Sequence, residues 1–428
     1  IRGYDLVFLG ILLFGIIPMG RKFFQYWYRL SMAHRYLLWW LITAFIWLFL
    51  TIYIGKKGQF IIGLVRYFRF FAFASIFVLG FLWIRNQKQL NLLFNLQIIA
   101  LTIISVIGTL QALKFLPNFW PSYYSIYWGG EGGFLITSTL APNHTHYSLM
   151  MAIGIIMIFT RITISGISNW LLIAATIPML YSMIASQGRS GWLLLGIYLI
   201  CNLLLIRKFT WIPVVIIFAG SITFLFSSNT EAGGTSIQKI LLYRTITSHE
   251  DTKRSVYDVF EESDRSLISR VDEDRWTIYS EVISYWSRFP VFFIAGAGFQ
   301  NAVKGIGGAA LAAHNAYLNI IAEQGILGFF IYVSFLFYLF RLGWRIAQKS
   351  PSPKARLFAK NWICLYMGLL AANFFGELIY PGRALFTFLG SVFFITVLYL
   401  HPAWSDKDQF YSSLRSQAEA VPKPLTNA

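Results

Sequence analysis

Charged side chains are scarce in this sequence. Asp, Glu, Lys and Arg make up only 12% of the 428 residues, whereas a soluble domain carries about twice that fraction. Cysteine is rarer still, and both copies, Cys201 and Cys364, lie within apolar runs, so neither a disulfide framework nor a cysteine metal site is indicated. The polar loops also lack a glycine-rich nucleotide-binding loop and an acidic metal cluster. These scarcities exclude an ordinary soluble domain and a disulfide-rich secreted one.

Apolar residues are abundant instead, and they occur in long runs. Hydrophobic residues make up 57% of the chain, and runs of about twenty of them predict an all-α polytopic membrane protein with about 11–12 transmembrane helices. Because the chain opens on Ile1 rather than Met, we expect part of the N-terminus to be missing. The predicted spans are 4–19, 37–54, 60–84, 90–112, 147–160, 168–186, 190–206, 211–226, 316–340, 361–380 and 384–400.

The basic residues mark one side of the membrane. The net charge of +17 comes from Lys and Arg in short loops beside the spans, a placement that anionic headgroups explain and that sets nucleic acid aside. Alternating the spans puts five basic loops on one side, which the positive-inside rule makes the cytoplasm. Lys56 and Lys57 are an exception, since they fall outside. The five loops contain residues 21–35, 85–88, 161, 207–208 and 341–360.

A polar insertion of about ninety residues interrupts the apolar runs and holds most of the acidic residues. Within it, Asp272–Asp274 suit a helix N-terminus, and an apolar stripe from Trp276 to Trp286 predicts an amphipathic helix that ends before Pro290. A flexible turn is expected at Gly296–Gly298. The expected organisation is an N-terminal transmembrane bundle (1–226, with an outer loop at 113–146), an outer loop with amphipathic helices (227–315), C-terminal transmembrane helices (316–400) and a cytoplasmic tail (401–428).

Three basic groups fall on the outer side of this topology: Arg189 between two spans, Arg275 at the start of the amphipathic helix, and His314 at the mouth of the ninth span. A pair of arginine forks suits a pyrophosphate, and a histidine near neutral pKa can accept a proton from a hydroxyl. Each has a simpler interpretation. Arg189 could anchor a helix end, Arg275 could pair with a nearby carboxylate, and His314 could cap its own helix.

Other polar residues lie within or beside spans. Arg66 and Arg69 share a face of the third span, either as functional charges or as snorkelling ones. Glu323 and Glu377 are the carboxylates most exposed to the cost of membrane burial. The His144-x-His146 pair follows Asn143, and helix capping by Asn143 accounts for this segment better than a metal site does.

Four motifs, in order along the chain, resemble those of the O-antigen ligase and polymerase superfamily of bacterial envelope proteins. They are Thr-Leu-Ala-Pro-Asn at 139–143, Ser-Gln-Gly-Arg-Ser-Gly-Trp at 186–192, Arg-Trp-Thr-Ile-Tyr at 275–279 followed by Phe-Pro at 289–290 and Gly-Ala-Gly at 296–298, and His-Asn-Ala-Tyr-Leu at 314–318 followed by Glu323 and Gly-Ile-Leu-Gly at 325–328. The last block is the most specific of the four.

The resemblance implies a C-type glycosyltransferase fold and transfer of a glycan from undecaprenyl pyrophosphate in the periplasm or at the outer leaflet of the bacterial inner membrane. It implies no nucleotide sugar, no metal and no other cofactor. Arg189 and Arg275 would hold the pyrophosphate, and His314 would assist the acceptor hydroxyl. The expected partners are the lipid-linked donor, a lipid A-core or lipid-linked glycan acceptor, and the bilayer, without nucleic acid. The residues expected to bind substrate are Arg66, Arg69, Arg270, Asn315, Tyr317, Glu377 and Arg383.

The motifs serve a ligase and a polymerase equally. The single large loop near the C-terminus and the modest length fit a ligase slightly better. The competing class, a polysaccharide flippase or transporter, predicts ionisable groups near the bilayer midplane and inverted repeats. The sequence shows no such repeat, and its candidate groups cluster at the outer ends of the spans.

Overall fold

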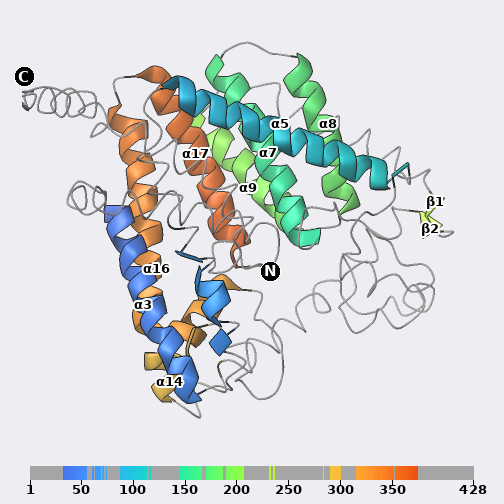
Figure 1. Ribbon diagram of the computed structural model, residues 1–428. Coiled ribbons are helices and arrows are strands. Elements are labelled where there is room, and N and C mark those ends of the chain that lie inside the picture. The colour runs from blue at the N-terminus through green and yellow to red at the C-terminus, as the bar shows by residue number, and fades with distance from the viewer. Residues whose placement is uncertain are drawn as a thin grey trace, which may run out of the picture.

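The structure is a computed structural model whose described part is a bundle of apolar helices (Figure 1). It describes residues 32–54, 60–61, 63–68, 70–71, 74, 87–112, 115–116, 144–165, 170–186, 189–206, 231–232, 235–236, 283, 290–299, 315–350 and 352–374. The predicted spans at 4–19, 211–226 and 384–400 lie outside these residues, as does most of the outer loop.

The helices follow the predicted apolar runs. They are α3 (Met32–Ile54), α5 (Gln87–Ala112), α7 (His144–Ser165), α8 (Trp170–Ala185), α9 (Arg189–Ile206), α14 (Pro290–Ala295), α16 (Ala316–Lys349) and α17 (Pro353–Ala372). The described residues between 60 and 74 are helical too. Residues 89–111, 147–164 and 316–349 are long and apolar enough to cross a membrane, which confirms the helical, membrane-type architecture. One small departure is the two-residue strand β1 (Glu231–Ala232), which pairs antiparallel with β2 (Thr235–Ser236).

The loop predicted at 341–360 is wrong. Helix α16 continues to Lys349 and α17 already begins at Pro353, so only residues 350–352 separate them. The Ser352 hydroxyl accepts from the Ala355 N–H at 3.3 Å, and Pro353 suits a first helical turn. Lys and Arg are good helix formers. The cluster of charge therefore extends two helices beyond their apolar parts instead of interrupting them. At its other end α17 stops at Ala372, eight residues before the predicted end of that span.

Pro290 is the first residue of α14. Proline fits this position because the first N–H groups of a helix have no intrahelical acceptor. The end of the amphipathic helix predicted before Pro290 lies outside the described residues. Of the predicted amphipathic stretch, the structure describes only Ile283, which is helical and exposed.

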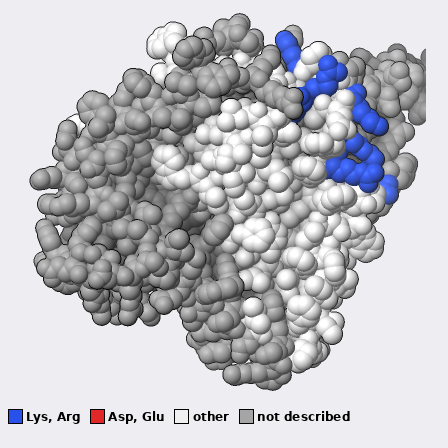
Figure 2. Space-filling view, turned by 180° about the vertical axis from the view of Figure 1, so that it is seen from behind, with Lys and Arg blue, Asp and Glu red and all other residues white. Residues whose placement is uncertain are grey.

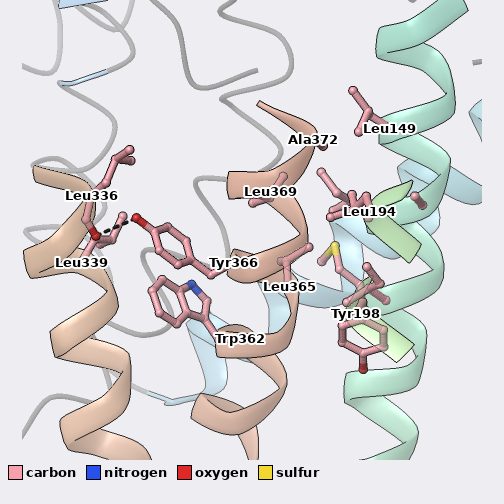
Figure 3. Packing of buried hydrophobic residues seen from close by; sticks show 14 of the residues in the cluster. Leu149, Leu194, Tyr198, Leu336, Leu339, Trp362, Leu365, Tyr366, Leu369 and Ala372 are labelled. Atoms are coloured by element: carbon pink, nitrogen blue, oxygen red, sulfur yellow. Dashed lines mark hydrogen bonds between the residues drawn. The ribbon is translucent and has the colours of Figure 1, made fainter. Parts of the chain in front are cut away.

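Helix α17 packs between α16 on one side and α7 and α9 on the other (Figure 3). Trp362 and Tyr366 lie toward α16, and the Tyr366 hydroxyl donates to the Leu336 carbonyl at 2.6 Å (Figure 3). Leu194 and Tyr198 of α9 lie on the opposite side of α17, and both are completely buried. α17 is thus the central element of the described core.

The directions of two contacting helix pairs fix the level of their ends. Tyr36 of α3 stacks on Tyr338 of α16 at 5.0 Å, whereas Trp40 contacts Tyr332, nearer the start of α16. In α9, Tyr198 donates to Asn361, while Leu194 lies against Gly368, farther along α17. α3 is therefore antiparallel to α16, and α9 is antiparallel to α17.

This arrangement gathers basic residues at one end of the bundle, which we call the basic end. Figure 2 shows Lys and Arg concentrated at one edge of the molecule and a largely uncharged surface elsewhere among the described residues on that face. The described segments of four of the five predicted cytoplasmic loops meet here, in agreement with the positive-inside interpretation. The basic residues in the last turns of α16 and the first turns of α17 are Arg341, Arg345, Lys349, Lys354, Arg356 and Lys360.

Candidate functional site at the motif end of the bundle

The end opposite the basic end, where α7, α9 and α16 begin and α5, α8 and α17 end, is the motif end. Ser182 of α8 donates to the Ser105 carbonyl at 2.8 Å, and its hydroxyl lies 3.1 Å from that of Thr109, which joins the last turns of α5 and α8. The Ala316 N–H donates to the Asn373 carbonyl at 3.1 Å and joins α16 to α17. The described residues of two motifs, those at 186–192 and 314–318, border this end. Its buried polar residues are Ser105, Gln111, Ser148, Ser182, Ser186, Ser190, Asn315, Asn319, Glu323, Gln324 and Asn373.

The start of α16 is capped by Asn315. Its side-chain oxygen accepts from the N–H groups of Tyr317 and Leu318 at 3.0 and 3.2 Å, and its carbonyl accepts from Asn319 at 3.0 Å. With the bond from Ala316 to Asn373, the four N-terminal donors of the helix are all satisfied. Asn315, and not His314, is therefore the cap.

A cluster of polar contacts holds this helix start against the end of α17. The Asn373 side chain is completely buried and donates to the Tyr332 hydroxyl at 2.6 Å. Tyr317 is half-buried and donates to the Leu370 carbonyl at 3.0 Å, while its ring lies 4.4 Å from that of Phe374. Asn315 and Tyr317 thus have structural roles, and substrate binding by them stays a prediction.

The starts of α7 and α9 lie against each other. A Cβ atom on Gly191 would overlap the hydroxyl and carbonyl of Ser148, so only glycine allows this crossing. Ser186 and Ser190 are buried beside it. Arg189 is the first residue of α9, which places its backbone at the motif end, although its side chain lies outside the described residues.

Helix α16 is broken at Gly325, whose φ of 64° and ψ of −172° are not helical. The Ala322 and Glu323 carbonyls accept instead from the N–H groups of Ala297 and Gly298, at 2.8 and 3.0 Å. We call residues Gly296–Phe299 the strap. They are buried and hydrogen-bonded, so the flexible turn predicted here is wrong.

Glu323 lies directly before the break and is completely buried. A carboxylate in an apolar span is costly, and it is retained where it has a function or partners. The break gives a physical reason for its position, since irregular backbone within a span is tolerated where protein surrounds it. Arg66 is half-buried, and the residue after it, Tyr67, contacts the strap: the Tyr67 ring lies 6.1 Å from that of Phe299.

The structure brings only part of the predicted site into view. It describes Arg66, Asn315 and Tyr317, together with the backbone of Arg189. Sequence reasoning missed Asn373, Gln324, Trp40 and Trp47, which support the start and the break of α16. Asn373 had a readable signal, an amide within an apolar span. The predicted site residues outside the described part are Arg69, Arg270, Arg275, His314, Glu377 and Arg383.

Comparison with known proteins agrees with this arrangement. A search of curated proteins gave no significant match. A family model described as O-antigen ligase matches residues 174–333, a segment that runs from α8 through α9, the outer loop and the strap to the middle of α16. It includes three of the four motifs and the break at Gly325. Over residues 174–333 the chain is therefore similar to the O-antigen ligase family.

Proposed function

We propose that this protein is a C-type membrane glycosyltransferase that moves a glycan from undecaprenyl pyrophosphate to a sugar hydroxyl. The outer loop at 227–315 would face the periplasm, and the membrane would be the bacterial inner membrane. Within the superfamily we favour an O-antigen ligase, with a lipid A-core sugar as acceptor. A polymerase would use the same chemistry with a second lipid-linked glycan as acceptor.

One observation carries the proposal: motifs far apart in the sequence lie at a single end of the bundle. α9 begins at Arg189, and α16 begins directly after the His314–Asn315 pair. Leu194, near the start of α9, lies against Gly368 in the last turns of α17, and the bond from Ala316 to Asn373 joins that end of α17 to the start of α16. Basic residues gather at the other end, and the positive-inside rule favours the cytoplasm for that end, which supports a site that faces the periplasm.

The proposed reaction is a displacement at the anomeric carbon of the donor. His314 accepts the proton of the acceptor hydroxyl as its oxygen bonds to that carbon. The bond from the anomeric carbon to the phosphate oxygen breaks, and undecaprenyl pyrophosphate leaves with the electron pair. Arg189 and Arg275 neutralise the charge that develops on it, through paired N–H donors that match phosphate geometry. No metal or nucleotide enters this scheme.

A deletion strain distinguishes the candidates through the lipid-linked glycans that accumulate. A ligase defect leaves full-length glycan on undecaprenyl pyrophosphate and none on lipid A-core. A polymerase defect leaves single repeats on both. A flippase defect leaves the lipid-linked repeat on the cytoplasmic side. The proposed function would be contradicted if the deletion changed neither the lipid-linked glycan on either side of the membrane nor the glycan on lipid A-core.

A further inference from the structure

Helix α3 precedes the segment that matches the family, yet it contacts the break in α16 and the strap at three points. The Trp40 indole N–H donates to the side-chain oxygen of Gln324 at 3.1 Å. The Trp47 indole N–H donates to the Ala295 carbonyl. The Trp47 carbonyl in turn accepts from the Phe299 N–H at 3.1 Å. α3 therefore holds the residue before the strap, the last residue of the strap and the residue next to Gly325.

The strap and the break in α16 are in close backbone contact. A Cβ atom on Gly325 would overlap the Ile294 carbonyl, and one on Gly296, whose φ is 75°, would overlap the Glu323 carbonyl. Strap and helix thus touch backbone to backbone. A shift of the strap by about 1 Å would break its hydrogen bonds to the Ala322 and Glu323 carbonyls.

The same tryptophan connects the break to the start of α16. The Trp40 ring lies 4.8 Å from that of Tyr332, and Tyr332 accepts from Asn373 at 2.6 Å. The Asn373 carbonyl holds the N–H of Ala316. Trp40 is 1% exposed, so this chain of contacts lies in the packed interior, where displacements are transmitted rather than absorbed.

We propose that Trp40 and Trp47 are positioning residues for the transfer reaction: they brace the strap against the break in α16, and so set the outer loop and the start of α16 in register. This rests on the proposed function, because it assigns the two segments to one active site. Neither tryptophan touches substrate. They act through Gln324, Ala295 and the strap.

The variants are Trp40→Phe and Trp47→Phe, which keep an aromatic ring and remove the donor. Trp39→Phe is the matched control, since Trp39 lies on the same helix with 54% of its surface exposed. With purified protein, lipid-linked donor and sugar acceptor, we expect kcat to fall about tenfold in either brace variant, with KM within about twofold. Trp39→Phe should match the wild type. All rates are measured well below each variant's Tm, so that global unfolding does not contribute.

A double-variant cycle tests whether Trp40 acts through Gln324. Gln324→Met removes the acceptor and keeps the volume, so Trp40→Phe should add little to it, within about twofold. Fully multiplicative effects would contradict the proposed path. So would a kcat equal to that of the wild type in Trp40→Phe and Trp47→Phe, even if their Tm were lowered, because the tryptophans would then be structural only.

A second readout does not depend on transfer. Ala297 is 1% exposed, so a cysteine there should react slowly with a maleimide in a background without Cys201 and Cys364. Trp47→Phe should raise the labelling rate at Ala297→Cys severalfold, and Trp39→Phe should not. Equal labelling in all three backgrounds would overturn the brace. A wild type without transfer activity but with the expected labelling pattern would instead remove the proposed function and leave the brace intact.

Discussion

The two ends of the bundle are built differently. The motif end buries eleven of the described polar side chains, breaks a helix at Gly325 and brings strap and helix into backbone contact. At the basic end Arg341, Arg345, Lys349 and Lys354 are exposed, and a small polar cluster lies on that side of the core, in which Tyr198 and Asn202 both bond to Asn361. Costly features are therefore concentrated where the superfamily motifs lie. At the basic end, the Lys and Arg residues are explained by the positive-inside rule, and the described helices there are regular.

The largest expected effect is that of filling the space at the break. Gly325→Ala would require a left-handed alanine and overlap with the Ile294 carbonyl, for a loss of at least about 3 kcal/mol in folding stability. Gly196→Ala is the matched control, because nothing lies within 4 Å of the added methyl group. It should change stability by no more than about 1 kcal/mol. Thermal unfolding in detergent measures both, and similar Tm values would show that the break is not needed.

The sequence and the structure agree well on helices and poorly on what joins them. Long apolar runs predict seven of the described helices, because a membrane-spanning helix needs about twenty consecutive apolar residues. Charge was read as loop at 341–360, although α16 and α17 run through it. The strap was read as flexible from its glycines, because their partners lie on α16 and α3, and no local pattern reveals contacts so distant in sequence. The capping role of Asn315, by contrast, is local, since its side chain bonds to residues two and three positions further on.

The next effect concerns the proposed base. His314→Ala and His314→Asn should each reduce transfer by about a hundredfold or more, while donor binding persists. The wild-type rate should fall as pH drops below the histidine pKa, because a protonated imidazole cannot accept the hydroxyl proton. Arg345→Gln at the basic end, where Arg345 is exposed, is the control and should transfer normally. An active His314→Asn with a flat pH profile would make His314 a positioning group.

The arginines come next. Arg189→Lys and Arg275→Lys keep the charge and lose the planar fork that pairs with phosphate oxygens. Each should cost about 2–4 kcal/mol of transition-state stabilisation, measured as a lower rate of transfer from the lipid-linked donor, with normal amounts of protein in the membrane. Arg341→Lys at the basic end should have no effect. Near-normal transfer by Arg275→Lys would reduce that residue to a surface ion pair.

The smallest effect is expected inside the basic end. Tyr198→Phe removes the hydroxyl that donates to Asn361 at 2.7 Å and accepts from Asn202 at 3.2 Å. A buried hydrogen bond contributes about 0.5–1.5 kcal/mol, so Tm should fall by a few degrees while transfer below Tm stays unchanged. A variant that folds normally but transfers slowly would mean that chemistry reaches this end of the bundle as well.

The comparison rests on the two ends facing opposite sides of the membrane, and one labelling experiment tests that directly. In a background without Cys201 and Cys364, Ser263→Cys reports on the outer loop and Lys354→Cys, at an exposed position of α17, reports on the basic end. An impermeant maleimide added to spheroplasts should label Ser263→Cys and spare Lys354→Cys until the membrane is opened. Labelling of Lys354→Cys with protection of Ser263→Cys would invert the topology and remove the motif end from the periplasm.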